Sequence, residues 1–270
     1  MYLQTRFFPP PEPVFPTGEP AWAIAFSGGK DSTALAFLAL DAAVRLDPPP
    51  RLAIVYGDTG VEIPPLRERA LRTLAVLRDE AAALGVPLEA VAAAPPPGKD
   101  FWDWYLRGYA FSPEAWARMP SRWCRDRLKA KPVAAALRRL GHPALLLGTR
   151  AGESRERAKA LAAGTRKGVW YPLAGWDTAA VWEYLLHRRP DIAAELAALY
   201  GCPDARTGCW VCPARPAGQQ MRRLARLPGW EWLEELAFLR ERVLAARGPE
   251  EREAVRRAWE KLRGGMCGGR

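Results

Sequence analysis

The sequence predicts an α/β protein built on a doubly wound parallel sheet, and three observations carry this prediction. Short apolar runs alternate along the chain with helical patterns, which is the order typical of parallel sheets. The first apolar run ends in a glycine turn that leads directly into a helical pattern. Polar sequences also follow the second and fourth apolar runs, and parallel sheets bind their ligands at the carboxyl ends of strands.

The expected elements follow from these patterns in chain order. Short apolar runs between polar turns predict strands over 22–26, 52–56, 87–92 and 144–147. Apolar residues near the helical period predict helices over 33–46, 66–84 and 176–187. The third of these helices has Asp177 as its expected N-cap. Two further helices, interrupted near Gly248-Pro249, are expected between 230 and 262.

The length of 270 residues suits one α/β domain with a smaller appendage. We expect an extended proline-rich arm over 1–20 and a nucleotide-binding α/β domain over 21–200. A segment with a cysteine cluster and C-terminal helices is expected over 201–263, and a flexible glycine-rich tail over 264–270.

Charge and hydropathy limit the classes of partner that the protein could bind. The formal net charge of +10 favours a phosphate-rich partner, although a GC-rich or thermophilic genome would also favour arginine. No apolar run approaches 18 residues, so we expect no membrane partner. The N-terminus lacks the apolar stretch of a signal peptide, which predicts a cytoplasmic protein.

The sequence Ser27-Gly28-Gly29-Lys30-Asp31-Ser32 is the most informative segment. A turn between a strand and a helix aims free backbone N–H groups and the positive end of the helix dipole at an anion. The glycines allow close approach and Lys30 adds a positive charge, so a phosphate group is the expected ligand. The segment is not a P-loop, because Ile24 and Asp31 stand where that motif needs Gly and Ser or Thr. The alternative is a chance glycine turn before a helix.

Charged residues follow two other expected strands. The carboxylates of Asp31 and Asp58 could hold Mg²⁺ on a nucleotide, and Asp58 could instead simply form a turn. Gly148 and Arg150 follow the fourth strand, with Arg157 close behind. Arginine suits phosphate or sulfate oxygens, and the alternative for these arginines is an ordinary solvated helix start.

Two further groups of residues leave alternatives open. The aromatic residues Trp102, Trp104 and Tyr105 either stack on bases or belong to a core. Clustered cysteines in a cytoplasmic protein indicate a metal or redox site rather than disulfides. A 4Fe–4S cluster, a structural zinc and a redox dithiol all remain open for the cysteines, which are Cys124, Cys202, Cys209, Cys212 and Cys267.

Several motifs in one order resemble the phosphoadenosine-phosphosulfate (PAPS) reductase family, and most of all its DndC-type sulfurtransferases of DNA phosphorothioation. These motifs are SGGKDS (27–32), DTGVE (58–62), FWDWYLRGY (101–109), RWCRDRLK (122–129), GTRAGESRERA (148–158), YPLAGWDTAAVWEYL (171–185) and TGCWVCP (207–213). The loop resembles the pyrophosphate (PP) loop of adenine-nucleotide α-hydrolases. The chain is shorter than the usual DndC-like protein.

The resemblance implies a function and a set of roles. ATP would adenylate an acceptor such as DNA or tRNA, release pyrophosphate, and let sulfur from a donor such as a cysteine desulfurase replace the activated oxygen. Residues 27–32 would hold the terminal phosphates, with Asp31 or Asp58 placing Mg²⁺ and Arg150 or Arg157 stabilising charge at the α-phosphate. The ligands of the cluster would be Cys124, Cys202, Cys209 and Cys212, and Cys267 could carry a persulfide.

Two alternative functions remain. In an adenylyl-sulfate or PAPS reductase, Cys267 would attack sulfur as a thiolate, although Met266-Cys267-Gly268 echoes that family's C-terminal signature only faintly. In a non-catalytic nucleotide-binding module with a structural metal, ATP would bind tightly without turnover.

Overall fold

A computed structural model gives the structure of residues 9–109, 111, 122–141, 144–162, 167–203, 205, 207–213 and 216–267. The chain divides into two compact units, and each of them is assembled from three separate segments of the sequence. The first unit comprises residues 1–57, 67–93 and 133–205. The second comprises 58–66, 94–132 and 206–270. The domain boundaries expected at residues 20, 200 and 263 stay predictions.

The first unit contains a five-stranded sheet in the order β3-β2-β1-β4-β5, with every pair parallel. The strands are β1 (Ala21–Phe26), β2 (Arg51–Gly57), β3 (Leu88–Ala93), β4 (Ala144–Leu146) and β5 (Val169–Trp170). Four of them fall where apolar runs predicted strands, and β5 was not expected. The doubly wound α/β fold is confirmed.

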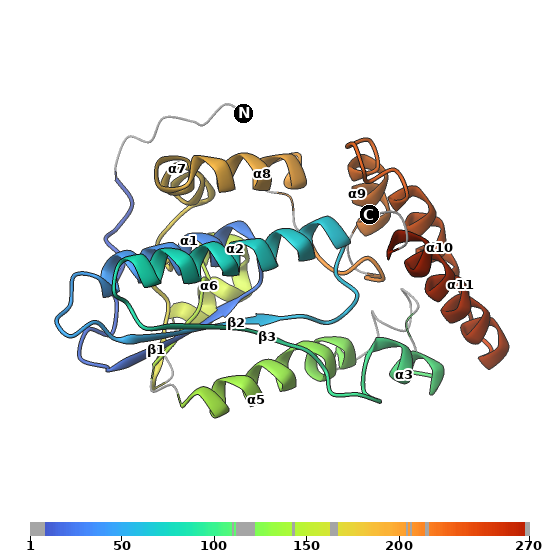
Figure 1. The fold of residues 1–270 in the computed structure, drawn as a ribbon, viewed down its shortest axis with the longest axis horizontal. Coiled ribbons are helices and arrows are strands. Elements are labelled where there is room, and N and C mark those ends of the chain that lie inside the picture. Colours follow the sequence, from blue (N-terminus) through green and yellow to red (C-terminus); the bar gives the residue numbers. More distant parts are fainter. Residues whose placement is uncertain are drawn as a thin grey trace. The chain divides into compact units, whose positions relative to one another are not determined.

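Alternate residues of β1 face opposite sides of the sheet, as the two-residue period of a strand requires. Trp22 and Ile24 belong to a large apolar core with the helices on one face. Ala23 points to the other face, where it meets Leu137 and Leu140. Figure 1 shows the same two layers, with α1 and α2 covering one face and α5 the other.

Three helices of the first unit lie where helical patterns predicted helices, over 33–46, 66–84 and 176–187, and the helices over 131–140, 155–162 and 190–200 were not expected. Asp177 caps α7 by accepting the Ala180 N–H at 2.8 Å, which confirms the expected N-cap. The helices are α1 (Lys30–Ala43), α2 (Pro64–Ala83), α5 (Lys131–Leu140), α6 (Arg155–Ala162), α7 (Thr178–Arg188) and α8 (Pro190–Tyr200), with a short 3₁₀ turn, η2 (Ala151–Glu153).

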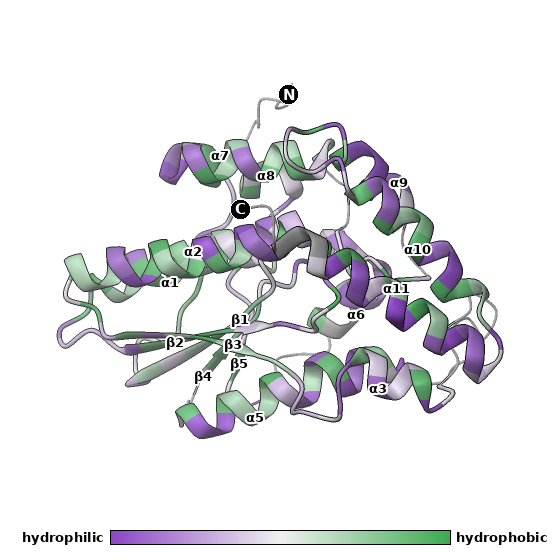
Figure 2. Ribbon diagram, turned by 45° about the vertical axis from the view of Figure 1, so that its right-hand side comes forward, coloured by the Kyte–Doolittle hydropathy of each residue, from purple (hydrophilic) through white to green (hydrophobic). Residues whose placement is uncertain are grey.

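Helices and aromatic rings make up most of the second unit. Tyr105 is buried and Trp102 packs against the rings of Trp210 and Trp259, so both belong to the core of this unit. Figure 2 shows hydrophobic and hydrophilic residues alternating around α10 and α11. The helices are α3 (Phe101–Leu106), the π-helix η1 (Arg125–Ala130), α9 (Ala217–Leu224), α10 (Leu233–Ala245) and α11 (Pro249–Cys267).

The C-terminal helices are interrupted between Ala245 and Pro249, as the sequence predicted. The last helix continues through Cys267, whereas a flexible tail was expected from residue 264. The backbone up to Cys267 is therefore helical, and the side chain of Cys267 lies outside the described residues.

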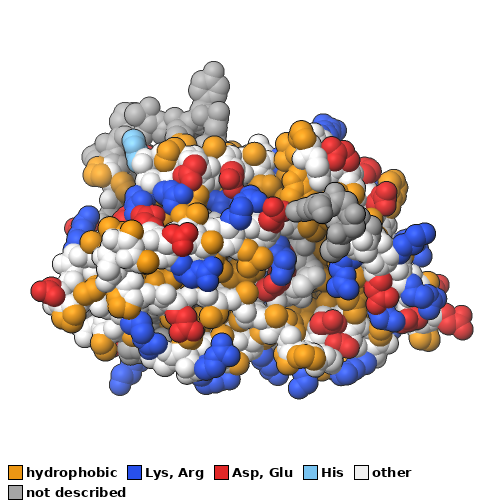
Figure 3. All heavy atoms as spheres, in the orientation of Figure 1, with side chains coloured by type: hydrophobic (Ala, Val, Ile, Leu, Met, Phe, Trp, Pro, Cys, Tyr) orange, Lys and Arg blue, Asp and Glu red, His pale blue; other side chains and the backbone are white. Residues whose placement is uncertain are grey.

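The surface mixes both signs of charge. Figure 3 shows basic and acidic side chains interspersed over the face in view, so the net charge of +10 is not gathered there in one large patch. Within the described part of the chain, every helix is too short or too polar to cross a membrane.

Candidate functional site

The loop between β1 and α1 is a tight turn closed by its own side chains. Gly28 has a φ of +72°, a left-handed conformation that favours glycine. Gly29 is the N-cap of α1, which begins at Lys30. The Ser32 hydroxyl accepts the Ser27 N–H at 3.1 Å and donates to the Gly29 carbonyl oxygen at 3.0 Å. The sequence therefore forms the expected strand, glycine turn and helix N-terminus.

Three charged side chains meet at this turn. Asp31 forms ion pairs with Lys30, at 3.2 Å from Nζ, and with Arg150, at 2.6 Å from Nε. Lys30 and Arg150 are only 6% and 3% exposed. Arg150 also donates to the Trp176 carbonyl oxygen at 3.3 Å and to the Thr178 hydroxyl at 3.4 Å. The guanidinium thus fixes the Asp31 carboxylate beside the loop.

Sheet order explains why distant residues reach this turn. β4 pairs with β1, so Gly148 after β4 lies against the first turn of α1. A Cβ added at Gly148 would come within 3.2 Å of the Asp31 carbonyl oxygen. The structure therefore brings residues 27–32, Gly148 and Arg150 together in the first unit.

Two other residues expected at the nucleotide site have different surroundings. Arg157 is 45% exposed on α6 and forms an ion pair with Glu153, one helical turn earlier. Asp58 belongs to the second unit, where its carboxylate accepts the Gly60 N–H at 3.2 Å. This contact is typical of the turn-forming role that the sequence left open for Asp58, and its role in holding Mg²⁺ stays a prediction.

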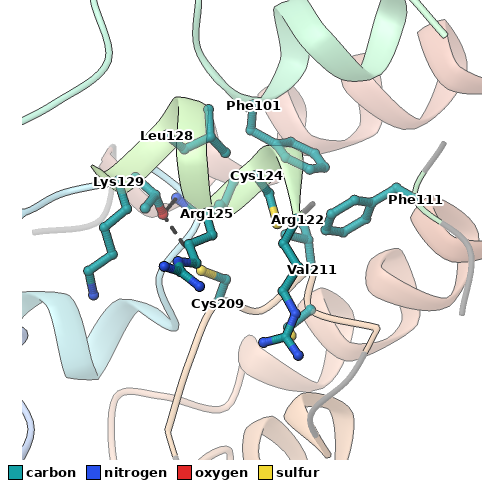
Figure 4. Close-up of a pocket in the computed structure, with 12 residues that line it drawn as sticks. Phe101, Phe111, Arg122, Cys124, Arg125, Leu128, Lys129, Cys209 and Val211 are labelled. Carbon is teal, nitrogen blue, oxygen red and sulfur yellow. Dashed lines mark hydrogen bonds between the residues drawn. The ribbon is translucent and has the colours of Figure 1, made fainter. Parts of the chain in front are cut away.

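Three cysteines line one cavity of about 370 Å³ in the second unit. Cys124 directly precedes the π-helix η1, a geometry that is rare and often found at functional sites. Cys209 and Cys212 come from the loop before α9, and Figure 4 shows the sulfur atoms of Cys124 and Cys209 at this cavity. The basic residues of its lining are Arg122, Arg125 and Lys129, and the apolar ones are Val61, Phe101, Phe111, Leu128 and Val211.

The loop that carries Cys209 is held by the turn after β2. Glu62 and Cys209 form an antiparallel bridge, and the Trp210 N–H donates to the Val61 carbonyl oxygen at 2.9 Å. The Thr59 hydroxyl lies 3.7 Å from Cys209 Sγ and donates to the Glu62 carboxylate at 2.6 Å. Thr59 and Glu62 therefore position a thiol, a role that sequence reasoning missed although both residues lie in the DTGVE motif.

Burial raises the pKa values of two thiols and one carboxyl group in this part of the second unit. It raises the pKa of the Cys209 thiol, and the charge of Glu62 raises it further. Burial likewise raises the pKa values of Cys124 and Glu62. A metal that bound these thiols would displace their protons. In the described ranges, no three His, Cys, Asp or Glu side chains converge closely enough to hold a metal ion.

Cys202, the fourth expected ligand, lies in the first unit. It follows Gly201, the residue that caps α8, and its side chain is exposed. The three thiols of the cavity thus come from one unit and the fourth expected ligand from the other, and the assignment of a ligand set stays a prediction.

Residues 21–215 match the phosphoadenosine phosphosulfate reductase domain. The chain belongs to this family. The resemblance to PAPS reductases is confirmed, and the closer likeness to DndC-type proteins stays a prediction. Both candidate sites, the glycine loop and the cysteine cavity, lie largely within the matched residues.

A curated protein and a solved structure are among the proteins to which this PAPS reductase family member is similar. A curated, uncharacterized protein of Methanocaldococcus jannaschii is 26% identical over 222 residues, which cover 77% of this chain and 39% of that protein. The chain thus spans about two fifths of that relative. The solved structure of the U34-tRNA thiolase NcsA from Methanococcus maripaludis, with its [4Fe-4S] cluster, aligns with a TM-score of 0.37 and 14% identity. It covers 90% of this chain and 72% of the thiolase, and so weak a likeness carries no argument.

Two more residues of this PAPS reductase domain protein contact the candidate sites, although both lie far from them in the sequence. Arg240 on α10 donates to the Cys212 carbonyl oxygen at 2.8 Å and so supports the cysteine loop. Tyr200 at the end of α8 accepts the Lys30 N–H at 3.1 Å. No local sequence pattern indicates either contact, because the hydrogen-bonded residues lie 28 and 170 positions apart in the sequence.

Proposed function

We propose that this protein is an ATP-dependent iron–sulfur sulfurtransferase of the PAPS reductase family. The observation that carries the proposal is a pair of chemically distinct sites within one family domain. One is a glycine turn flanked by buried basic side chains, and the other is a cavity lined by three thiols. Phosphate recognition and sulfur chemistry are the two capacities that such a transfer requires.

The glycine turn is the proposed site for the terminal phosphates of ATP. The first amides of α1, which lack partners within the helix, would donate to phosphate oxygens, and Lys30 would neutralise their charge. The Asp31 carboxylate would help hold Mg²⁺, with Arg150 keeping it in place. Attack of an acceptor oxygen on the α-phosphorus breaks the bond to the β-phosphate and releases pyrophosphate. Hydrosulfide then attacks the activated atom of the acceptor, a base carbon in tRNA or a phosphorus in DNA, and AMP leaves with the former acceptor oxygen.

A cavity lined by three thiols supports an iron–sulfur cluster as the proposed metal group. Its volume of about 370 Å³ is more than a single zinc needs, since zinc would draw each sulfur ligand to about 2.3 Å from one point. Cys124, Cys209 and Cys212 would hold the cluster, with Cys202 as the proposed fourth ligand. Nearby basic residues favour the negative charge of a thiolate cluster. When bound, the cluster would supply the site that holds or relays sulfur.

A nucleic acid, either DNA or tRNA, is the proposed acceptor. The Arg127 guanidinium lies 4.0 Å from the ring centroid of Trp104 and 5.3 Å from that of Tyr109. Arg107 lies 5.0 Å from the same tryptophan ring. Guanidinium groups beside partly exposed aromatic rings are chemically suited to phosphates and unstacked bases. A sulfur donor such as a cysteine desulfurase completes the proposed set of partners.

A sulfonucleotide reductase is the second candidate, and the family match itself favours it. In that reaction the loop would bind the substrate's phosphate or sulfate group, and Cys267 would attack sulfur as a thiolate. A non-catalytic nucleotide-binding module is the third candidate, and it predicts ATP binding without turnover.

One set of assays on anaerobically purified protein separates these candidates. Iron and zinc analysis with an absorption spectrum identifies the metal, and about four irons per chain are expected. Pyrophosphate release from ATP is then measured with DNA, with tRNA and with neither. Acceptor-dependent release that persists in Cys267→Ser supports the sulfurtransferase. Sulfite formation from adenylyl sulfate or PAPS that is lost in Cys267→Ser overturns it, and so does tight ATP binding without any product.

A further inference from the structure

Among the described residues, Tyr200 makes the hydrogen bond that links the most distant part of the sequence to residues 27–32, the proposed phosphate loop. It is the last residue of α8, it is buried, and its hydroxyl accepts the Lys30 N–H. The Lys30 ammonium lies 5.5 Å from the centroid of the Tyr200 ring. One aromatic side chain thus contacts both the backbone and the charge of the residue that the proposed function places on phosphate.

The hydroxyl also explains a glycine in the loop. A Cβ added at Gly29 would lie 3.0 Å from the Tyr200 oxygen, closer than most real contacts of this kind. The backbone of Gly29, with a φ of −84°, would itself accept any residue. The close approach of the Tyr200 hydroxyl therefore favours a residue without a side chain at position 29.

The same helix end carries a cysteine. Gly201 caps α8 in a left-handed conformation, and the exposed Cys202 follows immediately. On the far side, the Pro203 carbonyl oxygen accepts the Trp182 indole N–H at 3.2 Å. The ring of Trp182 packs edge-on against Tyr200, with centroids 5.8 Å apart. The Cys202 backbone is thus held between two anchors, one of which is the phosphate loop.

We propose that Tyr200 couples occupancy of the phosphate loop to the position of Cys202, an inference that rests on the proposed nucleotide site. A phosphate bound at the start of α1 competes with the Tyr200 hydroxyl for the Lys30 N–H, because this amide has no partner within the helix. When the hydroxyl yields, the end of α8 loses its tie to the loop. The backbone of Cys202, two residues further on, is then less restrained. By linkage, fixing Cys202 in its displaced position raises the affinity for phosphate.

The test measures the alkylation rate of Cys202 by iodoacetamide, with peptide mass spectrometry, in protein freed of metal under anaerobic conditions, because the proposed function makes Cys202 a cluster ligand. The reaction is run with and without α,β-methylene-ATP, or pyrophosphate as the smaller probe. Cys202 is already exposed, so we expect the ligand to change its alkylation rate by about threefold or more through the restraint on its backbone and not through access. Tyr200→Phe keeps the ring and removes only the hydroxyl, so this change should disappear.

The same variant should bind the probes more tightly. Without the competing hydroxyl, affinity for pyrophosphate should rise by about three- to tenfold, the usual worth of one hydrogen bond. Tyr184→Phe is the matched control, because its hydroxyl donates to Asp41 and does not contact the loop. It should leave both the affinity and the Cys202 response as in the unmodified protein.

The outcomes separate this inference from the proposed function. If neither probe binds to the unmodified protein, the nucleotide site itself is wrong. If a probe binds and the Cys202 rate does not change, the coupling is wrong and the nucleotide site stands. A full ligand response in Tyr200→Phe also overturns the coupling. The ligand response of Cys202 in the unmodified protein tests the coupling without any variant. This test therefore stays decisive even if Tyr200→Phe fails to fold.

Discussion

The phosphate loop and the cysteine cavity differ in how their polar groups are partnered. In the loop, Asp31 accepts from Lys30 and Arg150, and the Ser32 hydroxyl closes the turn. The cavity presents buried thiols among basic and apolar side chains, and burial raises the pKa of Cys124 and Cys209. The first site is organised before its ligand arrives, and the second gains its full set of bonds from its ligand.

This difference has a thermodynamic consequence. A nucleotide entering the loop exchanges existing hydrogen bonds for new ones, so its net affinity reflects a modest difference between them. A metal entering the cavity replaces thiol protons with bonds to sulfur, so its binding stabilises the fold strongly and depends on each thiol. Substitutions at the cavity should therefore have nearly all-or-none effects, and those at the loop should have graded ones.

Removing a thiol should give the largest effect. Cys209→Ser replaces a soft ligand with a hydroxyl that rarely ionises, so bound iron should fall more than tenfold in anaerobic iron and sulfide analysis. Cys267→Ser is the control and should keep its iron, since Cys267 is not among the proposed ligands. Affinity for ATP analogues should stay within about twofold in both variants. Full iron content in Cys209→Ser would contradict the assignment of this cavity.

Removing the buried lysine should give the next largest effect. Lys30→Ala deletes a charged donor beside the first turn of α1, and a hydrogen bond to a charged group is worth about 1.5–3 kcal/mol. ATP-analogue affinity should therefore fall by about ten- to a hundredfold in titration calorimetry. Lys159→Ala on the exposed surface of α6 is the matched control. Equal affinities in the two variants would remove Lys30 from the nucleotide site.

The Arg150–Asp31 pair should matter for stability more than an exposed pair of the same type. Arg150→Ala leaves a partly buried carboxylate with one partner fewer, and the free energy of unfolding should fall by about 3 kcal/mol. Arg157→Ala breaks the exposed pair with Glu153 and should cost about 0.5 kcal/mol. Urea denaturation of both variants measures the contrast. Similar losses would show that Arg150 does not anchor Asp31.

The sequence predicted what local patterns encode. Short apolar runs between polar turns predicted four of the five strands, because strands of a parallel sheet that is covered on both faces are largely apolar throughout. β5 has only two residues, and its place is set by pairing with β4. The Asp177 cap was predictable because capping depends on a neighbouring amide only three residues away.

Long-range pairing explains what the sequence did not predict. Thr59 and Glu62 stand in a recognisable motif, yet their role depends on a bridge to Cys209, about 150 residues away. Tyr200 reaches Lys30 only because α8 packs on the first unit's core. The interleaved segments of the two units have the same origin, since contacts between distant segments decide which residues pack together.

The smallest effect distinguishes the two loop glycines. Gly29→Ala should cost about 1 kcal/mol of unfolding free energy, because the new methyl group would press on the Tyr200 hydroxyl. In a Tyr200→Phe background this cost should shrink by at least half, since the obstructing oxygen is gone. Gly28→Ala should also cost about 1 kcal/mol, but equally in both backgrounds, because its penalty comes from the positive φ. Urea denaturation of the single and double variants provides the comparison. A Gly29→Ala cost that Tyr200→Phe leaves unchanged would mean that a contact other than the tyrosine hydroxyl keeps glycine at this position, since unfolded-state entropy favours alanine where φ is negative.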